Sequence, residues 1–249
     1  MSTSLDGAVV LVTGANGGLG VEFVRQALDR GASKVYATAR RPRDWKDSRI
    51  VPLALDVTDS NSINAAAEAA SDTTIVVNNA AIAILPDRLL HLPMAEVRRT
   101  FDTNFFGALE VARTFAPVVG NNGGGAFLHV HSVLSWFVGD PSEPVSGGHG
   151  AYSASKSAFW SATNTLRLEL AGQGTHVLGL HLGYTDTPMI ATIDEEGKES
   201  PADIVRIAYE GLLAGDFEVV ADWRSRTVKE ALSGPIEGVY PQLVKAASS

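Results

Sequence analysis

Tyr152 and Lys156 lie four positions apart in the segment AYSASKSAF, a spacing at which their side chains can act together. On a helix, this spacing places both side chains one turn apart on the same face. A tyrosine hydroxyl has a pKa of about 10, and a neighbouring cation lowers that pKa. At about 4 Å and an effective dielectric constant near 20, one charge contributes roughly 4 kcal/mol. The pair therefore predicts proton exchange at Tyr152 near neutral pH.

Ser132 ends an apolar segment, 126–132, that has the composition of a strand. A hydroxyl in this position can hydrogen bond a substrate oxygen and stabilise charge that develops there. A serine at a strand end is also a common turn former, and a tyrosine and a lysine at this spacing occur by chance. The three side chains together, downstream of a glycine-rich loop, favour an active site that acts on a carbonyl or alcohol oxygen.

The glycine-rich segment TGANGGLG joins a β-rich run to a helical stretch near the start of the chain. Gly14 permits a tight turn, Gly18 lets the backbone approach a pyrophosphate, and Gly20 lets the helix pack closely on the strand. The alternative is a purely structural turn. Because the helix N-terminus would face an anion, we interpret the segment as a dinucleotide site formed by Gly14, Asn16, Gly18, Leu19 and Gly20.

The residues after the second β-rich run indicate which dinucleotide is bound. An NAD site usually has an acidic residue about 20 positions beyond the glycines, where it accepts hydrogen bonds from the ribose. This sequence has Arg40 and Arg41 there. A guanidinium pairs bidentately with a 2′-phosphate, whereas a carboxylate repels it. The pattern predicts NADP(H), although two arginines at a strand end can also be simply solvated.

Two more β-rich runs end in residues suited to the same site. Asp56 and Val57 follow the third run, and Asn79, Ala80 and Ala81 follow the fourth. Open parallel sheets bind ligands at the carboxyl edge of their strands, so we expect these residues to contact the cofactor. Asp56 has an alternative use as the cap of the following helix.

The β-rich runs alternate with helical stretches along the whole chain, which predicts the fold that must position these side chains. Near-continuous apolar strands joined by helical crossovers form a parallel sheet covered on both faces. We predict one α/β domain over residues 1–249, a doubly wound (Rossmann) parallel sheet of about seven strands with helices on both faces. The expected strands are 8–13, 34–39, 50–55, 74–78, 126–132, 175–182 and 217–221, and the expected helices 19–30, 60–70, 95–119, 152–171 and 201–214.

Composition excludes several other classes of protein. A formal net charge of -8 with scattered basic residues argues against nucleic-acid binding. No apolar stretch is long enough to span a membrane or form a signal peptide, so a cytoplasmic protein is expected. The chain has no cysteine. His129 and His131 alternate on one strand and could bind a metal, but no further ligand cluster accompanies them, so we predict no metal site.

These motifs resemble those of the short-chain dehydrogenase/reductase family, in its single-domain branch of about 250 residues, across nearly the whole chain. The family's NNAG motif corresponds to NNAA here, and its helical asparagine to Asn104 in DTNFFG. The resemblance implies that Tyr152 is the general acid/base, that Ser132 orients the carbonyl, and that Lys156 holds the ribose and lowers the Tyr152 pKa. It implies that Asn104 supports a water leading to Lys156, and that the segment LGYTDT, with Thr185 and Thr187, holds the carboxamide.

The sequence also departs from the family pattern where the substrate would bind. Ser132 and Tyr152 are farther apart than usual, so segment 139–150 is expected to border the active site, and the segment after Met189 is short. The apolar side chains in these regions form either a substrate wall or core and subunit contacts. They are Trp136, Phe137, Val138, Met189 and Ile190.

We therefore predict an NADP(H)-dependent carbonyl reductase or alcohol dehydrogenase that acts on a small molecule. The resemblance implies a homodimer or homotetramer. One alternative is a regulator that senses NADP without turnover, against which the complete set of catalytic residues argues. Another is a nucleotide-sugar epimerase or dehydratase, which usually has a longer C-terminal substrate domain.

Overall fold

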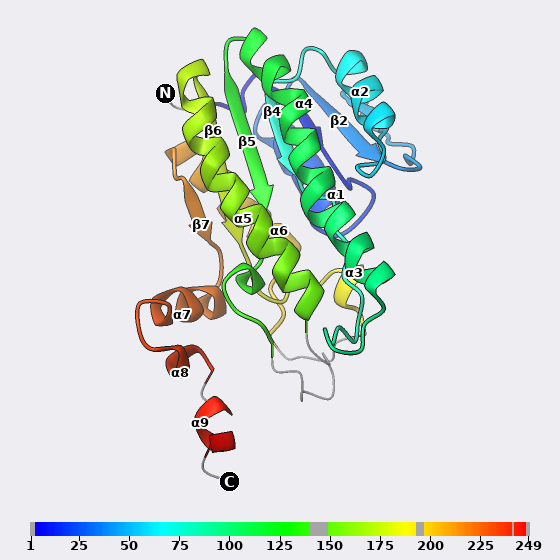
Figure 1. Ribbon diagram of the computed structural model, residues 1–249. Helices are drawn as coiled ribbons and strands as arrows, with labels where there is room; N and C mark the ends of the chain where they lie inside the picture. The colour runs from blue at the N-terminus through cyan, green and yellow to red at the C-terminus, as the bar shows by residue number, and fades with distance from the viewer. Residues whose placement is uncertain (1–2, 140–148, 193–196, 241, 248–249) are drawn as a thin grey trace.

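The computed structural model describes residues 3–139, 149–192, 197–240 and 242–247. Within these residues, a parallel sheet of seven strands has the order β3-β2-β1-β4-β5-β6-β7 (Figure 1). This confirms the predicted doubly wound fold. The strands are β1 (Val9–Val12), β2 (Lys34–Ala39), β3 (Ile50–Ala54), β4 (Ile75–Asn78), β5 (Gly125–Val130), β6 (Thr175–His181) and β7 (Glu218–Val220).

Helices cover both faces of the sheet. On one face, α1 (Leu19–Asp29) and α6 (Pro201–Ala214) pack against each other and against alternate residues of the central strands. On the other face lie α2 (Ser60–Ala69), α4 (Ala108–Asn121) and α5 (Gly150–Leu170), with α4 and α5 in front of the sheet in Figure 1. Parallel strands buried on both faces are apolar throughout, which explains why alternation was absent from the sequence.

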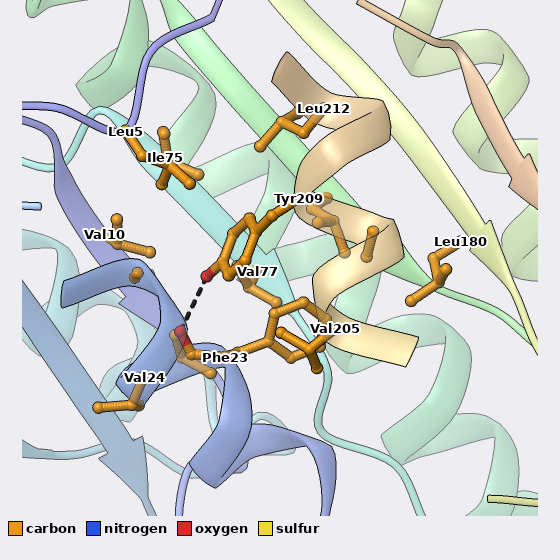
Figure 2. Packing of buried hydrophobic residues seen from close by; sticks show 14 of the residues in the cluster. Leu5, Val10, Phe23, Val24, Ile75, Val77, Leu180, Val205, Tyr209 and Leu212 are labelled. Atoms are coloured by element: carbon orange, nitrogen blue, oxygen red, sulfur yellow. Dashed lines mark hydrogen bonds between the residues drawn. The ribbon is translucent and has the colours of Figure 1, made fainter. Parts of the chain in front are cut away.

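The core between α1 and α6 is fixed by an aromatic contact (Figure 2). Phe23 of α1 and Tyr209 of α6 meet edge to face, with ring centroids 5.5 Å apart. The Tyr209 hydroxyl also donates a hydrogen bond of 2.9 Å to the Phe23 carbonyl. Burial raises the pKa of Tyr209 above its ordinary value, so its proton is retained. This contact sets the position of α1 and therefore of the glycine-rich loop that precedes it.

The strand order creates a crevice at the carboxyl edge of the sheet. The chain passes outward from β1 to β2 and β3, then returns to β4 on the other side of β1. The loops after β1 and β4 leave in opposite directions, and ligands bind open sheets at such a switch point. The residues that follow β1, β2, β4 and β5 all reach this edge.

The predicted helix 95–119 is confirmed as helical, but it is not a regular α-helix throughout. The structure has α3 (Met94–Phe101), a π-helical segment (Asp102–Gly107) and α4 in its place. The sequence also gave no indication of α7 (Trp223–Ala231), α8 (Ile236–Val239) and α9 (Gln242–Ala247), which extend beyond β7 at the C-terminal end (Figure 1). These helices are short or rich in charge, so they lack the apolar periodicity on which the prediction depended. No helix of the described residues is long and apolar enough to cross a membrane.

Three buried histidines lie between α5 and the strands β5 and β6. The ring centroids of His129 and His131 are 6.3 Å apart, and His131 lies 5.0 Å from His181. Phe159 packs against both His129 and His131. The described residues contain no group of three or more His, Cys, Asp or Glu side chains that could hold a metal. In this structure the histidines belong to an aromatic core.

These histidines should make the protein sensitive to mild acid. Burial lowers the pKa of His129 and His181 to about 3, and that of His131 well below 6.5. The unfolded chain therefore binds more protons than the folded one below pH 6.5, and stability falls as pH decreases from there toward 3. We expect the free energy of unfolding, from urea titrations, to drop between pH 7 and pH 5 by about 2 kcal/mol for each histidine.

Two variants test whether the buried histidines cause the loss of stability in acid. His131→Leu removes one buried titrating group and should make the acid-induced loss smaller by about 2 kcal/mol. His91→Ala, at an exposed histidine, should leave the loss as in the parent. A free energy of unfolding that is the same at pH 7 and pH 5 would contradict the explanation.

Candidate active site

A cleft of about 1480 Å³ lies at the carboxyl edge of the sheet, at the switch point. Its volume exceeds the 300–1,000 Å³ of an ordinary ligand pocket, which is expected where a dinucleotide and a substrate bind together. Of the predicted site residues, Gly20 and Asn104 lie outside its lining. Those in the lining are Gly14, Asn16, Gly18, Leu19, Arg40, Arg41, Asp56, Val57, Asn79, Ala80, Ala81, Ser132, Tyr152, Lys156, Thr185 and Thr187.

The glycine-rich loop has a backbone that other residues would not adopt. Gly14 and Gly18 have φ values of 66° and 53°. At Gly20, a Cβ would lie 2.2 Å from the carbonyl oxygen of Gly14, so only glycine fits there. No side chain caps the N-terminus of α1. The Gly20 N–H donates to the Gly17 carbonyl at 3.1 Å, and the positive end of the helix dipole remains able to attract an anion. The loop provides the close backbone approach that a pyrophosphate requires.

Thr13 joins this loop to the end of β4, a role that the sequence reasoning missed. Its hydroxyl accepts hydrogen bonds from the backbone N–H groups of Asn79 and Ala80, at 2.9 and 3.0 Å. The Asn79 side-chain amide donates in turn to the Thr13 carbonyl at 2.9 Å. The only available signal was the position of a hydroxyl residue directly before the first glycine of the motif. Through these hydrogen bonds Asn79 holds the glycine-rich loop in position, and it also lines the cleft.

The arginines after β2 are exposed and line the end of the cleft near the glycine-rich loop. The Asn16 side chain donates to the Arg41 carbonyl at 2.8 Å and so joins the two loops. Hydrogen bonds from Thr58 lower the pKa of Asp56, and the charge of Arg40 lowers it further. The positive charge of this region therefore lies beside an ionised carboxylate.

The alternative use of Asp56 as a helix cap is wrong. The residue that caps α2 is Asp59, whose side chain accepts from the Asn61 N–H at 2.9 Å. Asp56 instead forms a local turn with Thr58, at 3.0 Å to the backbone nitrogen and 2.7 Å to the hydroxyl. Its position in the lining leaves it available to a ligand.

Ser132, Tyr152 and Lys156 meet at the other end of the cleft. Tyr152 and Lys156 lie on successive turns of α5, and the Lys156 ammonium is 5.8 Å from the centre of the Tyr152 ring. Lys156 is 3% exposed, and its Nζ donates to the Val130 carbonyl at 2.8 Å. Ser132 follows β5, where its hydroxyl caps a 3-10 helix, Val133–Ser135, by accepting from the Leu134 N–H at 3.2 Å.

The structure does not show the lowering of the Tyr152 pKa that the sequence predicts. Burial raises the pKa of Tyr152 to about 12, and a hydrogen bond with Ser132 opposes the shift without cancelling it. Burial also lowers the pKa of Lys156 to about 8. Placing both groups in a poorly solvated region disfavours their charged forms, and the sequence estimate did not include this cost.

Asn104 lies in the π-helical segment, outside the cleft lining and close to the turn of α5 that contains Lys156. Its side-chain amide donates to the Ile82 carbonyl at 2.9 Å, and its side-chain oxygen accepts from the Ile82 N–H at 2.8 Å. The same amide donates to the Ser155 hydroxyl at 3.2 Å, which connects it to α5 next to Lys156. The π-helical turn is a local widening of the helix, a feature that often occurs at functional sites.

Thr185 and Thr187 follow β6 and close the cleft over the glycine-rich loop. A Cβ at Gly18 would lie 3.2 Å from Cγ2 of Thr187, so the two loops are in contact. The Thr185 hydroxyl is buried and has no hydrogen-bond partner among the described residues. Such a group usually has a partner. An amide-bearing ligand would supply one, so the cleft fits a nicotinamide dinucleotide.

The regions predicted to border the substrate are partly described. Residues 140–148 of segment 139–150 and residues 193–196 after Met189 lie outside the described part of the chain. Of the predicted apolar wall, Phe137, Met189 and Ile190 line the cleft. Trp136 is instead stacked on His181, with ring centroids 3.8 Å apart. Val138 is exposed outside the lining.

Comparisons with known proteins agree with this geometry. The sequence model of the short chain dehydrogenase family matches residues 8–198. A galactitol 2-dehydrogenase (L-tagatose-forming) of Cereibacter sphaeroides is 32% identical over 200 residues, which cover 77% of this chain and 76% of that protein. A short chain dehydrogenase from Burkholderia cenocepacia, solved in complex with NADP, is 29% identical with a TM-score of 0.85, over 96% of this chain and 99% of that one.

A 3-ketoacyl-(acyl-carrier-protein) reductase from Brucella melitensis, complexed with NADH, is 24% identical with a TM-score of 0.77. The match covers 87% of this chain and 97% of the reductase, and at this identity the likeness shows the fold alone. The chain belongs to the short chain dehydrogenase family. It is accordingly an oxidoreductase of the type that uses a nicotinamide cofactor.

Proposed function

We propose that this protein is a single-domain, NADP(H)-dependent oxidoreductase that interconverts a small carbonyl compound and its alcohol, with reduction as the expected direction. The observation that supports it most is the position of Ser132, Tyr152 and Lys156 at one end of the cleft that also contains the glycine-rich loop. A dinucleotide along that loop would extend toward these three side chains. We further propose, from the resemblance to the family, a homodimer or homotetramer in the cytoplasm.

The proposed mechanism assigns proton transfer to Tyr152. Its hydroxyl donates a proton to the substrate oxygen in reduction and accepts one in oxidation, while the Ser132 hydroxyl hydrogen bonds the same oxygen. Bound nicotinamide supplies or accepts the hydride. Because the pKa of Lys156 is about 8, its ammonium is charged at neutral pH and stabilises negative charge on Tyr152. Asn104 maintains this arrangement through Ile82 and Ser155.

The first test is NADPH oxidation, followed by absorbance, against a panel of aldehydes, ketones, diketones and steroids, with NADH in parallel. Turnover of any member supports the proposed function. Tight binding of NADPH with no turnover across the panel would instead favour the regulator that senses the cofactor.

The cofactor preference gives a separate prediction. Arg40 and Arg41 are exposed at the end of β2, where a 2′-phosphate would form charge-assisted hydrogen bonds with them. We expect NADPH to bind more tightly than NADH by about 10- to 100-fold, the range of one or two such bonds. Arg40→Asp should narrow or invert this ratio in fluorescence titrations. The control Arg206→Asp changes an exposed arginine on α6, outside the cleft, and should preserve it. Equal affinities in the parent would contradict the assignment.

A further inference from the structure

Beside Tyr152 the structure has a histidine that lines the cleft and an aspartate next to it, neither of which the proposed proton transfer uses. Asp87 and His149 are paired by a parallel β-bridge between two loop segments, and they are 2% and 4% exposed. His149 lines the cleft together with Tyr152 and Tyr184. Burying polar side chains is unfavourable unless they form hydrogen bonds, so a buried histidine in the cleft lining points to a ligand contact.

Asp87 is fixed by the first turn of α5. Its Oδ2 accepts a hydrogen bond of 2.9 Å from the Tyr152 backbone N–H, and its backbone carbonyl accepts from Gly150 at 3.1 Å. Its Oδ1 is buried and has no hydrogen-bond partner among the described residues. The Asp87 carboxylate thus holds the first turn of α5, which contains Tyr152. Its negative charge also acts to raise the pKa of the neighbouring His149.

The His149 side chain is held in place without serving the helix. His149 is the N-cap residue of α5, but its side chain makes no capping hydrogen bond. Its Nε2 lies 3.4 Å from the Tyr184 hydroxyl, and its ring centroid is 6.5 Å from that of Tyr152. The backbone of Gly139 also approaches the ring closely, because a Cβ there would lie 3.0 Å from Cδ2 of His149. The imidazole therefore has a defined position in the cleft wall.

The charge states of His149 and Asp87 determine which kind of ligand group can bind beside them. Burial lowers the pKa of His149 despite the opposing effect of Asp87, so the ring is neutral at physiological pH. A neutral imidazole with a carboxylate nearby does not attract an anion. It can donate a hydrogen bond from one nitrogen and accept one at the other, which suits a hydroxyl or carbonyl oxygen. His149 and Tyr152 both line the same cleft, so a substrate in it can place one oxygen at each side chain.

We propose that His149, supported by Asp87 and Tyr184, binds a second, uncharged oxygen of the substrate. The preferred substrates are then hydroxyketones, or the corresponding diols in the oxidative direction, with the second oxygen one or two carbons from the reacting carbon. This inference rests on the proposed reaction at Tyr152, because it names the substrate class of that same site.

The experiment compares kcat/KM for 1-hydroxy-2-butanone, 2-butanone and 2-oxobutanoate, with NADPH as the reductant. The parent should prefer the hydroxyketone to the alkyl ketone by about 10- to 100-fold, because the alkyl ketone lacks the oxygen that would hydrogen bond His149. His149→Ala should bring this ratio to within about threefold of unity. His149→Asn retains a donor and an acceptor, so its ratio should lie between those of His149→Ala and the parent. Tyr184→Phe should lower the ratio by less than His149→Ala does. The control His91→Ala, at an exposed histidine outside the cleft, should keep the ratio of the parent.

Damage to the fold would lower kcat/KM for the hydroxyketone and for the alkyl ketone together. A change in the ratio of the two therefore reports binding of the second oxygen and not loss of structure. A ratio that is the same in the parent, His149→Ala and His149→Asn would overturn the proposal. A preference for 2-oxobutanoate would also overturn it and assign the contact to the Arg224 guanidinium, which packs on Tyr184. If the parent reduces none of the three but turns over another member of the carbonyl panel, the inference about His149 fails and the proposed function stands, whereas no turnover of any carbonyl would count against the proposed function itself. A protein that reduces all three without discrimination retains the proposed function and loses only the inference about His149.

Discussion

Tyr152→Phe is expected to lower kcat by about 1000-fold while the Kd for NADPH changes by less than about threefold. The substitution removes only the hydroxyl that would exchange a proton with the substrate oxygen, and it keeps the ring. Lys156 would still contact the Val130 carbonyl, so the wall of the cleft should persist. Single-turnover kinetics and a fluorescence titration with NADPH measure the two quantities separately.

Tyr36→Phe is the matched control for this prediction. The Tyr36 hydroxyl lies on β2, where it hydrogen bonds Asp72 at 2.9 Å, and it does not line the cleft. Its removal should leave kcat unchanged. A Tyr152→Phe enzyme with the kcat of the parent would exclude Tyr152 as the proton donor.

Gly20→Ala is expected to raise the Kd for NADPH by about 10- to 100-fold, the range expected when one backbone hydrogen bond to the charged pyrophosphate is lost. The new Cβ would lie 2.2 Å from the Gly14 carbonyl oxygen and 2.9 Å from the Ala15 Cα. Both contacts are with backbone, so the glycine-rich loop itself must shift away from the helix. Calorimetric titration of NADPH into the folded variant would measure the loss.

Gly172→Ala adds the same methyl group at a glycine with nothing within 4 Å of the new Cβ, outside the cleft. Its Kd for NADPH should match that of the parent. Circular dichroism would establish that Gly20→Ala is folded at the temperature of the titration. An unchanged Kd in the folded Gly20→Ala variant would contradict the assignment of this loop to the cofactor.

The sequence could predict the site largely because the topology is regular. Once β-rich runs and helices alternate, the residues that follow each strand must meet at one edge of the sheet. The segment TGANGGLG and Ser132 were found in this way, since their chemistry and position were both local. The pairing of Tyr152 with Lys156 likewise depends only on helix periodicity.

Features that depend on tertiary contacts could not be predicted in the same way. Asn104 lies in a π-helical turn and hydrogen bonds Ile82, and nothing in the sequence periodicity marks either feature. The pKa of Tyr152 rises because its hydroxyl is desolvated by the surrounding protein, which the spacing of Tyr152 and Lys156 does not report. Asp87 was overlooked for a similar reason, because its partner, the Tyr152 N–H, is distant in the chain.

The contact between Phe23 and Tyr209 has a thermodynamic consequence for cofactor binding. The glycine-rich loop leads into α1, and the segment with Thr185 and Thr187 precedes α6, so both sides of the dinucleotide cleft are joined to one core. A ligand that bridges these loops would crosslink regions that are distant in sequence. At 100 times its Kd, such a ligand adds about 2.7 kcal/mol to the free energy of unfolding. The supply of cofactor would then help to determine how long the folded protein persists.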